Sequence, residues 1–367
     1  MAKVIFIMTD SQRYDMVNAN VHTGLKTPCL DRLAAQGVRF TQAYTTQPVC
    51  QPARAALFTG LYPHSCNSWT NSVALSADVH TIGQRLRDNG IRTAYIGKWH
   101  LDGGDYFGLG KCPDGWDPDY WYDMRNYLDE LTPEERYASR QTSTMETQDV
   151  PSSFTYAHRC TDRAVRFLQE HGGEDNFLLC VSYDEPHHPY LCPREYWEQY
   201  KDYEFPKSPN VEDTLEGKPD YQRVWAGEKW KQDRSAVHIR DPFYFGCNSF
   251  ADAQIGRVLD AVEQYAGEDA YVFYTSDHGD FLESHCLSGK GPAAYEEITH
   301  IPLFLKGPGI PSGSVSEEPV SHINVAPAIF ELFGLKRPPV FAGESLMPQA
   351  RGEVGRVNDY CFIEFGR

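Results

Sequence analysis

Cys50 stands in the segment best suited to chemistry, Cys50-Gln51-Pro52-Ala53-Arg54. Because Pro52 favours a helix start, we expect the thiol at the positive end of that helix, where anions bind well. Arg54 lies four residues further, one turn along the same face, and can support the same site. The pattern predicts a reactive group facing an anion, although a buried or low-pKa cysteine near a helix start fits the same letters.

Two apolar, strand-like segments each lead to an aspartate. Residues 6–8 are followed by Asp10, and residues 271–274 by Asp277 and His278. Ligands of open α/β sheets bind at the carboxyl ends of strands. Two carboxylates and an imidazole there form a hard metal site. A single aspartate more often caps a loop or helix, but the pair, together with Cys50, favours the metal site.

Lysines and histidines follow other predicted strands or the loop after the second aspartate. They are Lys98, His100, His187, His188 and Lys290. Each one alone reads as a solvated or structural side chain. Together they suit an oxyanion substrate, with acid–base help for its leaving group.

Strand-like and helix-like segments alternate along the chain. Strands are expected over 4–8, 38–44, 91–96, 177–181 and 271–274, and helices over 30–36, 82–89 and 252–265. Such alternation predicts an α/β fold, with a sheet covered by helices on both faces. A last strand-like segment is expected at 360–363.

Residues 102–150 and 184–246 lack clean periodicity and are rich in Asp, Tyr, Trp, Pro and Glu. We interpret them as long insertions over one edge of the sheet, where binding loops usually lie. Their aromatic side chains offer stacking faces for sugars or simply pack inside the protein. The residues in question are Trp116, Tyr120, Trp121, Tyr122 and Trp197.

The chain has 367 residues and a formal net charge of −17. An acidic surface argues against nucleic acid and anionic membranes as partners. The first apolar run is too short for a signal peptide, and no stretch is long enough to span a membrane. The ten cysteines form no CxxC pair. These features predict a cytoplasmic protein with free thiols.

The ordered motifs resemble the type I, formylglycine-dependent sulfatases of the alkaline-phosphatase-like superfamily. The resemblance covers about residues 3 to 335 and looks closest to bacterial, cytoplasmic members of the family. The matching segments are Thr27 to Ala34, Cys50 to Gly60, Gly97 to Leu101, Thr275 to Gly279, Gly289 to Pro292 and Ile301 to Leu303.

This resemblance implies an alkaline-phosphatase-like three-layer α/β/α sandwich with a large, mixed and mostly parallel sheet. Residues 1–335 would form the catalytic domain, including the two insertions. Residues 336–367 would begin a smaller C-terminal subdomain that is truncated in this sequence.

The resemblance also implies that a maturation enzyme oxidises Cys50 to formylglycine. The hydrated aldehyde would attack sulfur with one hydroxyl and expel sulfate with the other. Asp10, Asp277 and His278 would hold a metal ion together with residue 50. Calcium is the usual ion in the family, with Mg²⁺ or Mn²⁺ as alternatives.

The remaining roles are carried over in the same way. Arg54 would orient the diol, and His100 would lie close to residue 50. Lys98, Lys290 and Asn71 would bind the sulfate. His187 would protonate the leaving oxygen, with His188 as the second choice.

The implied reaction is metal-dependent hydrolysis of a sulfate ester, of a sugar or of another organic alcohol. Asp10 is followed by Ser11 where many members have a second aspartate, and His278 replaces a common Asn. Because this histidine also occurs in phosphonate monoester hydrolases, phosphonate or phosphodiester hydrolysis is the alternative. A third reading is an unmatured, inactive homologue that binds a metal and an oxyanion.

Overall fold

A seven-stranded sheet forms the centre of the computed structural model, which describes residues 2–365. All neighbouring strands run parallel except β7, which is antiparallel to both of its neighbours. The sheet is therefore mixed and mostly parallel, as predicted. In spatial order the strands are β4 (Arg92–Gly97), β5 (Phe177–Ser182), β1 (Lys3–Thr9), β6 (Ala270–Ser276), β7 (Leu303–Lys306), β2 (Val38–Phe40) and β8 (Ser314–Ser316).

Strand β1 is buried along its whole length. Ile5 and Ile7 point into one hydrophobic core, whereas Val4, Phe6 and Met8 point into the other. A strand with apolar residues on both faces is typical of a parallel sheet that is covered on both sides.

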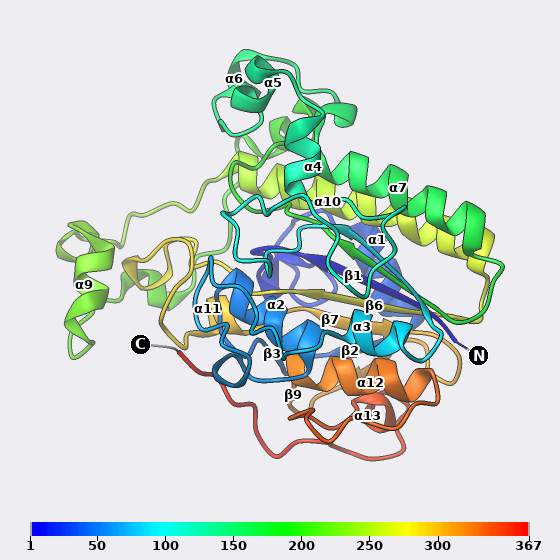
Figure 1. The fold of residues 1–367 in the computed structure, drawn as a ribbon. Coiled ribbons are helices and arrows are strands. Elements are labelled where there is room, and N and C mark those ends of the chain that lie inside the picture. The colour runs from blue at the N-terminus through cyan, green and yellow to red at the C-terminus, as the bar shows by residue number, and fades with distance from the viewer. Residues whose placement is uncertain (1, 366–367) are drawn as a thin grey trace.

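Helices cover both faces of the sheet and complete a three-layer sandwich (Figure 1). One layer contains α1 (Pro28–Gln36), α7 (Tyr156–His171) and α10 (Pro242–Ala261). The other contains α2 (Cys50–Thr59), α3 (Ile82–Arg87), α12 (Val325–Leu332) and α13 (Met347–Ala350). The predicted helix coverage of both faces is confirmed.

The two insertions contain short helices. In Figure 1 the first insertion stands at the top with α4 (Met124–Asp129), α5 (Pro133–Ala138) and α6 (Thr144–Thr147). The second contains α8 (Arg194–Trp197) and α9 (Asp220–Ala226), and α9 projects at the left. Capping boxes begin α4 and α5, which explains how such short helices form without hydrophobic periodicity.

The smaller elements complete the description. A second sheet pairs β3 (Ala43–Tyr44) with β9 (Val320–Ser321), and α11 (Glu296–Thr299) precedes β7. Single helical turns lie at Tyr14–Met16, Pro63–Ser65, Ser152–Phe154, Glu198–Tyr200, Pro209–Glu212, Lys229–Lys231, Val262–Ala266, Ser284–Cys286 and His322–Asn324. No helix within residues 2–365 has the length and apolar character needed to cross a membrane.

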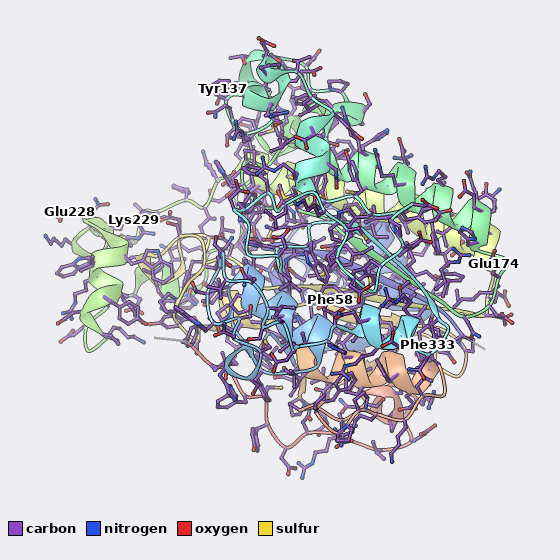
Figure 2. All side chains as sticks on the ribbon, viewed as in Figure 1. Phe58, Tyr137, Glu174, Glu228, Lys229 and Phe333 are labelled. Atoms are coloured by element: carbon purple, nitrogen blue, oxygen red, sulfur yellow. The ribbon has the colours of Figure 1, made fainter. Side chains whose placement is uncertain are left out.

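The aromatic side chains of the insertions pack inside the protein. Trp116 contacts Phe58, Tyr95 and Trp99, with ring centroids 5.1–6.3 Å apart. Phe58, labelled near the centre of Figure 2, belongs to α2, all of whose residues are buried. Tyr120, Tyr122 and Trp197 are likewise buried, and Trp121 packs partly buried against Tyr95 and Trp99. Of the two alternatives left open for these rings, packing inside the protein is confirmed for the four buried ones, whereas Trp121 is only partly buried.

Several predicted boundaries are wrong. Helix α10 begins at Pro242 rather than residue 252, because Asp241 caps its first turn by accepting a bond from the Tyr244 N–H. The predicted strand 38–44 divides into β2 and β3, which join different sheets. Residues 360–363 form no strand; the backbone bond nearby joins the Glu364 N–H to the Thr46 carbonyl.

Helix α7 was not predicted, although Cys160, Ala164, Phe167 and Leu168 have helical spacing and all lie in one core. After residue 335, Phe341, Leu346 and Met347 pack into the core on the α2 side. The assignment of 336–367 to the start of a further subdomain stays a prediction.

Asp252 on α10 ties α1 into its layer. Its carboxylate accepts hydrogen bonds from the backbone N–H groups of Cys29 and Leu30, at 3.1 and 2.8 Å. We predict that Asp252→Ala lowers the free energy of unfolding by about 2 kcal/mol, because it leaves buried helix-start donors unpaired. Urea unfolding measures the loss.

Asp260 provides the matched control, since it joins the same two helices through an exposed ion pair with Arg32 at 2.6 Å. Asp260→Ala should cost less than about 0.5 kcal/mol. Equal losses in both variants would contradict the capping role of Asp252.

Candidate active site

Four strands deliver polar side chains to the same edge of the sheet. Asp10 follows β1, and Asp277 and His278 follow β6. Lys98 directly follows β4, and Asp184 comes shortly after β5. Because these strands run parallel, their carboxyl ends meet, which confirms the placement expected from sequence.

Helix α2 begins at Cys50, two positions before the proline that predicted its start. Its N-cap residue is Val49, whose apolar side chain cannot accept a hydrogen bond from the free N–H groups of the first turn. Instead, the exposed Asn71 accepts a bond from the Gln51 N–H at 3.1 Å. Asn71 thus lies beside the helix start, and its expected contact with sulfate stays a prediction.

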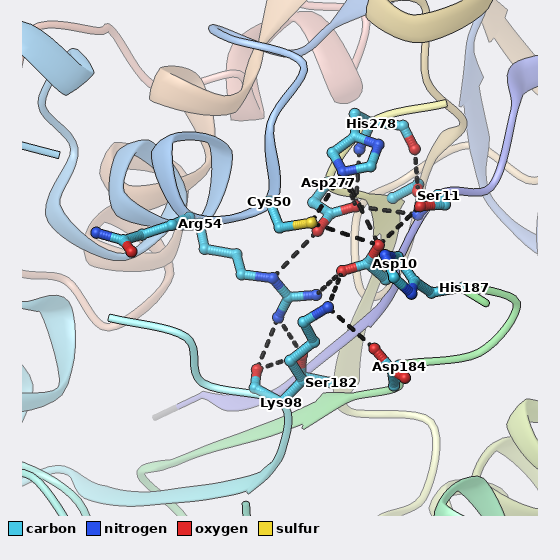
Figure 3. A network of polar contacts seen from close by, with 12 residues as sticks. Asp10, Ser11, Cys50, Arg54, Lys98, Ser182, Asp184, His187, Asp277 and His278 are labelled. Atoms are coloured by element: carbon cyan, nitrogen blue, oxygen red, sulfur yellow. Dashed lines mark hydrogen bonds and ion pairs between the residues drawn. The ribbon is translucent and has the colours of Figure 1, made fainter. Parts of the chain in front are cut away.

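Arg54 holds the centre of the site together (Figure 3). Its Nη2 pairs with Asp10 Oδ2 and its Nε with Asp277 Oδ2, each at 3.1 Å. Its Nη1 donates to the Lys98 carbonyl and to Ser182 Oγ, both at 2.7 Å. Since Arg54 and both carboxylates are fully buried, one guanidinium fixes the two strand-end aspartates in a single orientation.

The remaining oxygens of the two carboxylates face Cys50 and His278. Cys50 Sγ lies 3.2 Å from His278 Nε2 and 3.7 Å from Asp10 Oδ1. His278 Nε2 is 3.6 Å from Asp277 Oδ1. The four ligand atoms of Asp10, Cys50, Asp277 and His278 all lie within 4.8 Å of one another.

This donor set fits a divalent cation. His278 Nδ1 contacts the Gly279 carbonyl at 2.8 Å, which leaves Nε2 free to bind a metal. Two carboxylates suit calcium or magnesium, whereas imidazole and thiolate are typical ligands of transition metals. An oxygen at position 50, as in formylglycine, would make the set more favourable for calcium.

Positive side chains surround the cluster. Lys98 Nζ contacts Asp10 Oδ2 at 2.7 Å and Asp184 Oδ1 at 2.9 Å. Lys290 Nζ contacts Ser11 Oγ at 3.3 Å. Two cations on either side of Asp10 are well placed to attract an oxyanion.

These charges shift the ionisation of the buried groups. Burial raises the pKa of Cys50, but Lys290, Lys98 and His278 outweigh it and hold the pKa of the thiol well below its usual value. Burial also raises the pKa of Asp10, which Lys98 and other positive groups nevertheless hold well below normal. The site therefore favours negative charge at Cys50 and Asp10.

The pKa of Asp277 shifts in the opposite direction, upward. Burial, followed by repulsion from Asp10, raises the pKa of Asp277 to about 7. Burial lowers the pKa of His278, but Asp277 and Cys50 overcome this and bring it to about 9. A divalent cation bound by these ligands would stabilise the deprotonated carboxylate and so lower the pKa of Asp277.

The three candidate histidines outside the metal-ligand cluster occupy different positions. His187 Nδ1 contacts the His188 carbonyl at 2.7 Å and Tyr106 Oη at 2.9 Å. His188 is exposed, and its Nε2 contacts Thr142 Oγ1 at 3.1 Å. His100 is buried beside Cys50; burial lowers its pKa, and a hydrogen bond with the thiol opposes this. His187 and His100 therefore belong to the site, whereas His188 points to its rim.

A polar cavity of about 490 Å³ lies next to Lys290 and Ser11, which adjoin the cluster. Ser11, His187 and Lys290 form part of its wall, together with Arg240 and Asp241. A hydroxyl-rich substrate would find both donors and acceptors on this side.

Comparison with known proteins decides the family. The model of the sulfatase family matches residues 2–335. The chain is also 43% identical over 363 residues to the uncharacterized sulfatase YidJ of Escherichia coli, covering 97% of this chain and 73% of that protein. The chain belongs to the sulfatase family. Its members are sulfuric ester hydrolases, so the family predicted from the ordered motifs is confirmed.

Two further matches are less similar in sequence. The N-acetylglucosamine-6-O-sulfatase of Bacteroides thetaiotaomicron is 24% identical over 421 residues, covering 95% of this chain and 71% of that protein. The crystal structure of a phosphonate monoester hydrolase of Agrobacterium radiobacter superposes with a TM-score of 0.78 at 23% identity, covering 96% of this chain and 77% of that one. The second match confirms the alkaline-phosphatase-like fold.

Sequence reasoning missed three residues of this sulfatase site. Asp184 was detectable, because it too follows a buried strand. Ser182 carries no signal of its own, since serines near strand ends are common. Tyr106 lies in the irregular first insertion, yet its ring covers Lys98 Nζ at 4.1 Å.

We predict that millimolar Ca²⁺ raises the melting temperature of the EDTA-treated protein by several degrees, because an ion bound only by the folded site stabilises it. Asp277→Asn should remove this increase, since it halves the carboxylate charge of the cluster. Differential scanning calorimetry with and without Ca²⁺ measures the effect.

Asp280→Asn is the control, because Asp280 is nearby but outside the cluster. That variant should keep the full increase. An unchanged increase in Asp277→Asn would show that calcium binds elsewhere.

Proposed function

We propose that this chain hydrolyses a sulfate ester of a sugar or a similar organic alcohol, with residue 50 as nucleophile after conversion of Cys50 to formylglycine. The observation that carries the proposal is the position of Cys50 at the start of α2, within 4.8 Å of the ligand atoms of Asp10, Asp277 and His278. Lys290 and Lys98 are both close enough to lower the pKa of the Cys50 thiol, so the nucleophile and the anion-binding groups share one site.

A divalent cation held by Asp10, Asp277, His278 and residue 50 would polarise the ester and offset its negative charge. We propose calcium, with magnesium or manganese as alternatives. Arg54 would hold both carboxylates in a fixed orientation, so that the cation and residue 50 keep a constant geometry. Arg54 would thus act as a positioning residue. The contact of Arg54 with the diol remains a proposal.

Lys98 and Lys290 would bind the sulfate oxygens. The two ammonium groups lie on different loops, near Asp10 and near Ser11 respectively. Charge that builds up on sulfate oxygens during attack would be stabilised by donors already in place. Asn71 would add a neutral contact next to the helix start.

His187 would protonate the leaving oxygen. Both of its described contacts use Nδ1, so Nε2 remains available to the substrate. The contact of Nδ1 with a carbonyl fixes the ring orientation, as a general acid requires. His100 would contact residue 50 and limit the rotation of its side chain.

A sulfated sugar is the proposed substrate class. The polar cavity of about 490 Å³ beside Lys290 suits a hydroxylated ring. The N-acetylglucosamine-6-O-sulfatase relative supports the same class. A formylglycine-generating enzyme is the proposed maturation partner.

The proposed compartment is the cytoplasm. All ten cysteines are free of disulfides, and most are buried inside the domain. Unpaired thiols in this number fit a reducing environment.

We predict that protein co-expressed with a formylglycine-generating enzyme hydrolyses 4-nitrophenyl sulfate faster than the matching phosphonate monoester and phosphodiester. Cys50→Ala should lower kcat/KM by about 10⁴-fold or more, because the nucleophile is lost. The rates are followed by nitrophenol absorbance, and thermal melting checks that the variant folds.

Cys112→Ala is the matched control, since Cys112 is a half-buried cysteine in the first insertion. It should retain wild-type rates. Preference for the phosphorus esters would instead support the phosphonate alternative and make His278 the residue to study. Activity on none of these esters, together with an unconverted thiol, would support the inactive homologue.

A further inference from the structure

A second cavity, of about 250 Å³, lies beside His187 and has no role in the chemistry described above. Its wall is mostly apolar and comes largely from the first insertion. Tyr106, Phe107, Met124, Tyr127, Leu128 and Tyr156 are among the residues that form it.

This apolar cavity shares a wall with the oxyanion site. Tyr106, Asp184 and His187 line it, and the first two also contact Lys98. The Tyr106 hydroxyl bonds to both Asp184 and His187. A substituent close to the esterified oxygen of a bound substrate could therefore enter the cavity while the sulfate stays near Lys98.

Two polar atoms of wall residues have no hydrogen-bond partner within residues 2–365. They are Glu185 Oε2 and Tyr156 Oη, and both side chains are buried. Glu185 Oε1 is engaged, because it accepts a bond from the Ala157 N–H at 2.8 Å. Buried polar atoms normally have partners, so this pair indicates a ligand that supplies one.

Both unpaired groups can act as donors. Burial, with Asp184 adding to it, raises the pKa of Glu185 to about 8, so its free oxygen carries a proton at neutral pH. Burial also raises the pKa of Tyr156 well above its usual value, which keeps its phenol protonated. The wall thus presents two O–H groups that have no oxygen or nitrogen acceptor within residues 2–365, with only the Cys160 thiol close to the Tyr156 hydroxyl.

We propose that the apolar cavity receives an uncharged acylamino substituent of the sulfated sugar, with its carbonyl oxygen accepting from Tyr156 and Glu185 and its methyl group on the apolar wall. This inference rests on the proposed function and narrows its substrate class.

Other substituents match the wall less well. A cationic group would find no free partner among the wall residues described, because Asp184 is paired with Lys98. An anionic group would have to reach Arg140, which is exposed and lies over the Phe107 ring, and it would leave the apolar wall without a contact. A purely apolar group would leave both O–H groups unpaired. A substituent that consists of a hydroxyl group alone would leave the apolar wall of the cavity without a contact.

The test compares N-acetylglucosamine and glucose sulfated at the same carbon, for the 3-, 4- and 6-positions. The wild-type enzyme should prefer the acetamido sugar at one position or more, by about tenfold in kcat/KM. Tyr156→Phe should reduce this preference about fivefold through KM, as expected for one neutral hydrogen bond. Ser139→Leu, which adds carbon atoms at the cavity wall, should remove the preference.

Two variants serve as controls. Glu185→Gln keeps an acceptor for Ala157 and a donor for the ligand, and should retain the preference. Tyr137→Ala changes an exposed ring at the outer end of the same insertion (Figure 2) and should leave all rates unchanged.

A second readout is independent of turnover. Saturation-transfer NMR should detect the acetamido methyl of N-acetylglucosamine bound to wild type and to Tyr137→Ala, but not to Ser139→Leu. The inference is overturned by an unchanged preference in both Tyr156→Phe and Ser139→Leu, or by a methyl signal that survives Ser139→Leu. Failure to hydrolyse any sulfate ester would contradict the proposed function, and the NMR result would still decide the role of the cavity.

Discussion

The ion pairs between Arg54 and two strand-end carboxylates are the interaction on which the site depends. Asp10 and Asp277 arrive from neighbouring strands and would repel each other in a fully buried place. One guanidinium binds the outer oxygen of each, which leaves the inner oxygens facing Cys50. Since Arg54 and Cys50 lie on the same helix, the position of α2 and the geometry of the cluster are fixed together.

The helices packed on the sheet hold the Arg54 ion pairs in place. On the α2 side, Phe58 packs against Phe6 with ring centroids 5.9 Å apart, and so secures the helix against the strand that carries Asp10. The insertions then shape what surrounds the cluster. A polar cavity lies beside Lys290 and an apolar one beside Tyr106, so different parts of one organic group would meet different surroundings.

Much of this site could be predicted from the sequence because strand ends and helix starts leave local signals. The apolar runs that end at Asp10 and Asp277 predicted the edge of the sheet at which the site lies. They also predicted the two carboxylates of the cluster. The partners of Arg54 could not be predicted, since they come from the ends of four separate strands. The contact of Tyr106 with Lys98 depends on an insertion without periodicity, and Trp116 proved to be a core residue because burial is decided by tertiary packing.

The central claim is that residue 50 acts as an aldehyde-derived nucleophile inside this charge cluster. Its most direct test is mass spectrometry of the peptide containing Cys50, from active protein treated with an aldehyde-specific hydrazine probe. The account predicts a peptide carrying an aldehyde in place of the thiol, in a proportion that follows specific activity across preparations. Full sulfate ester hydrolysis by protein whose Cys50 is entirely an unmodified thiol would contradict it.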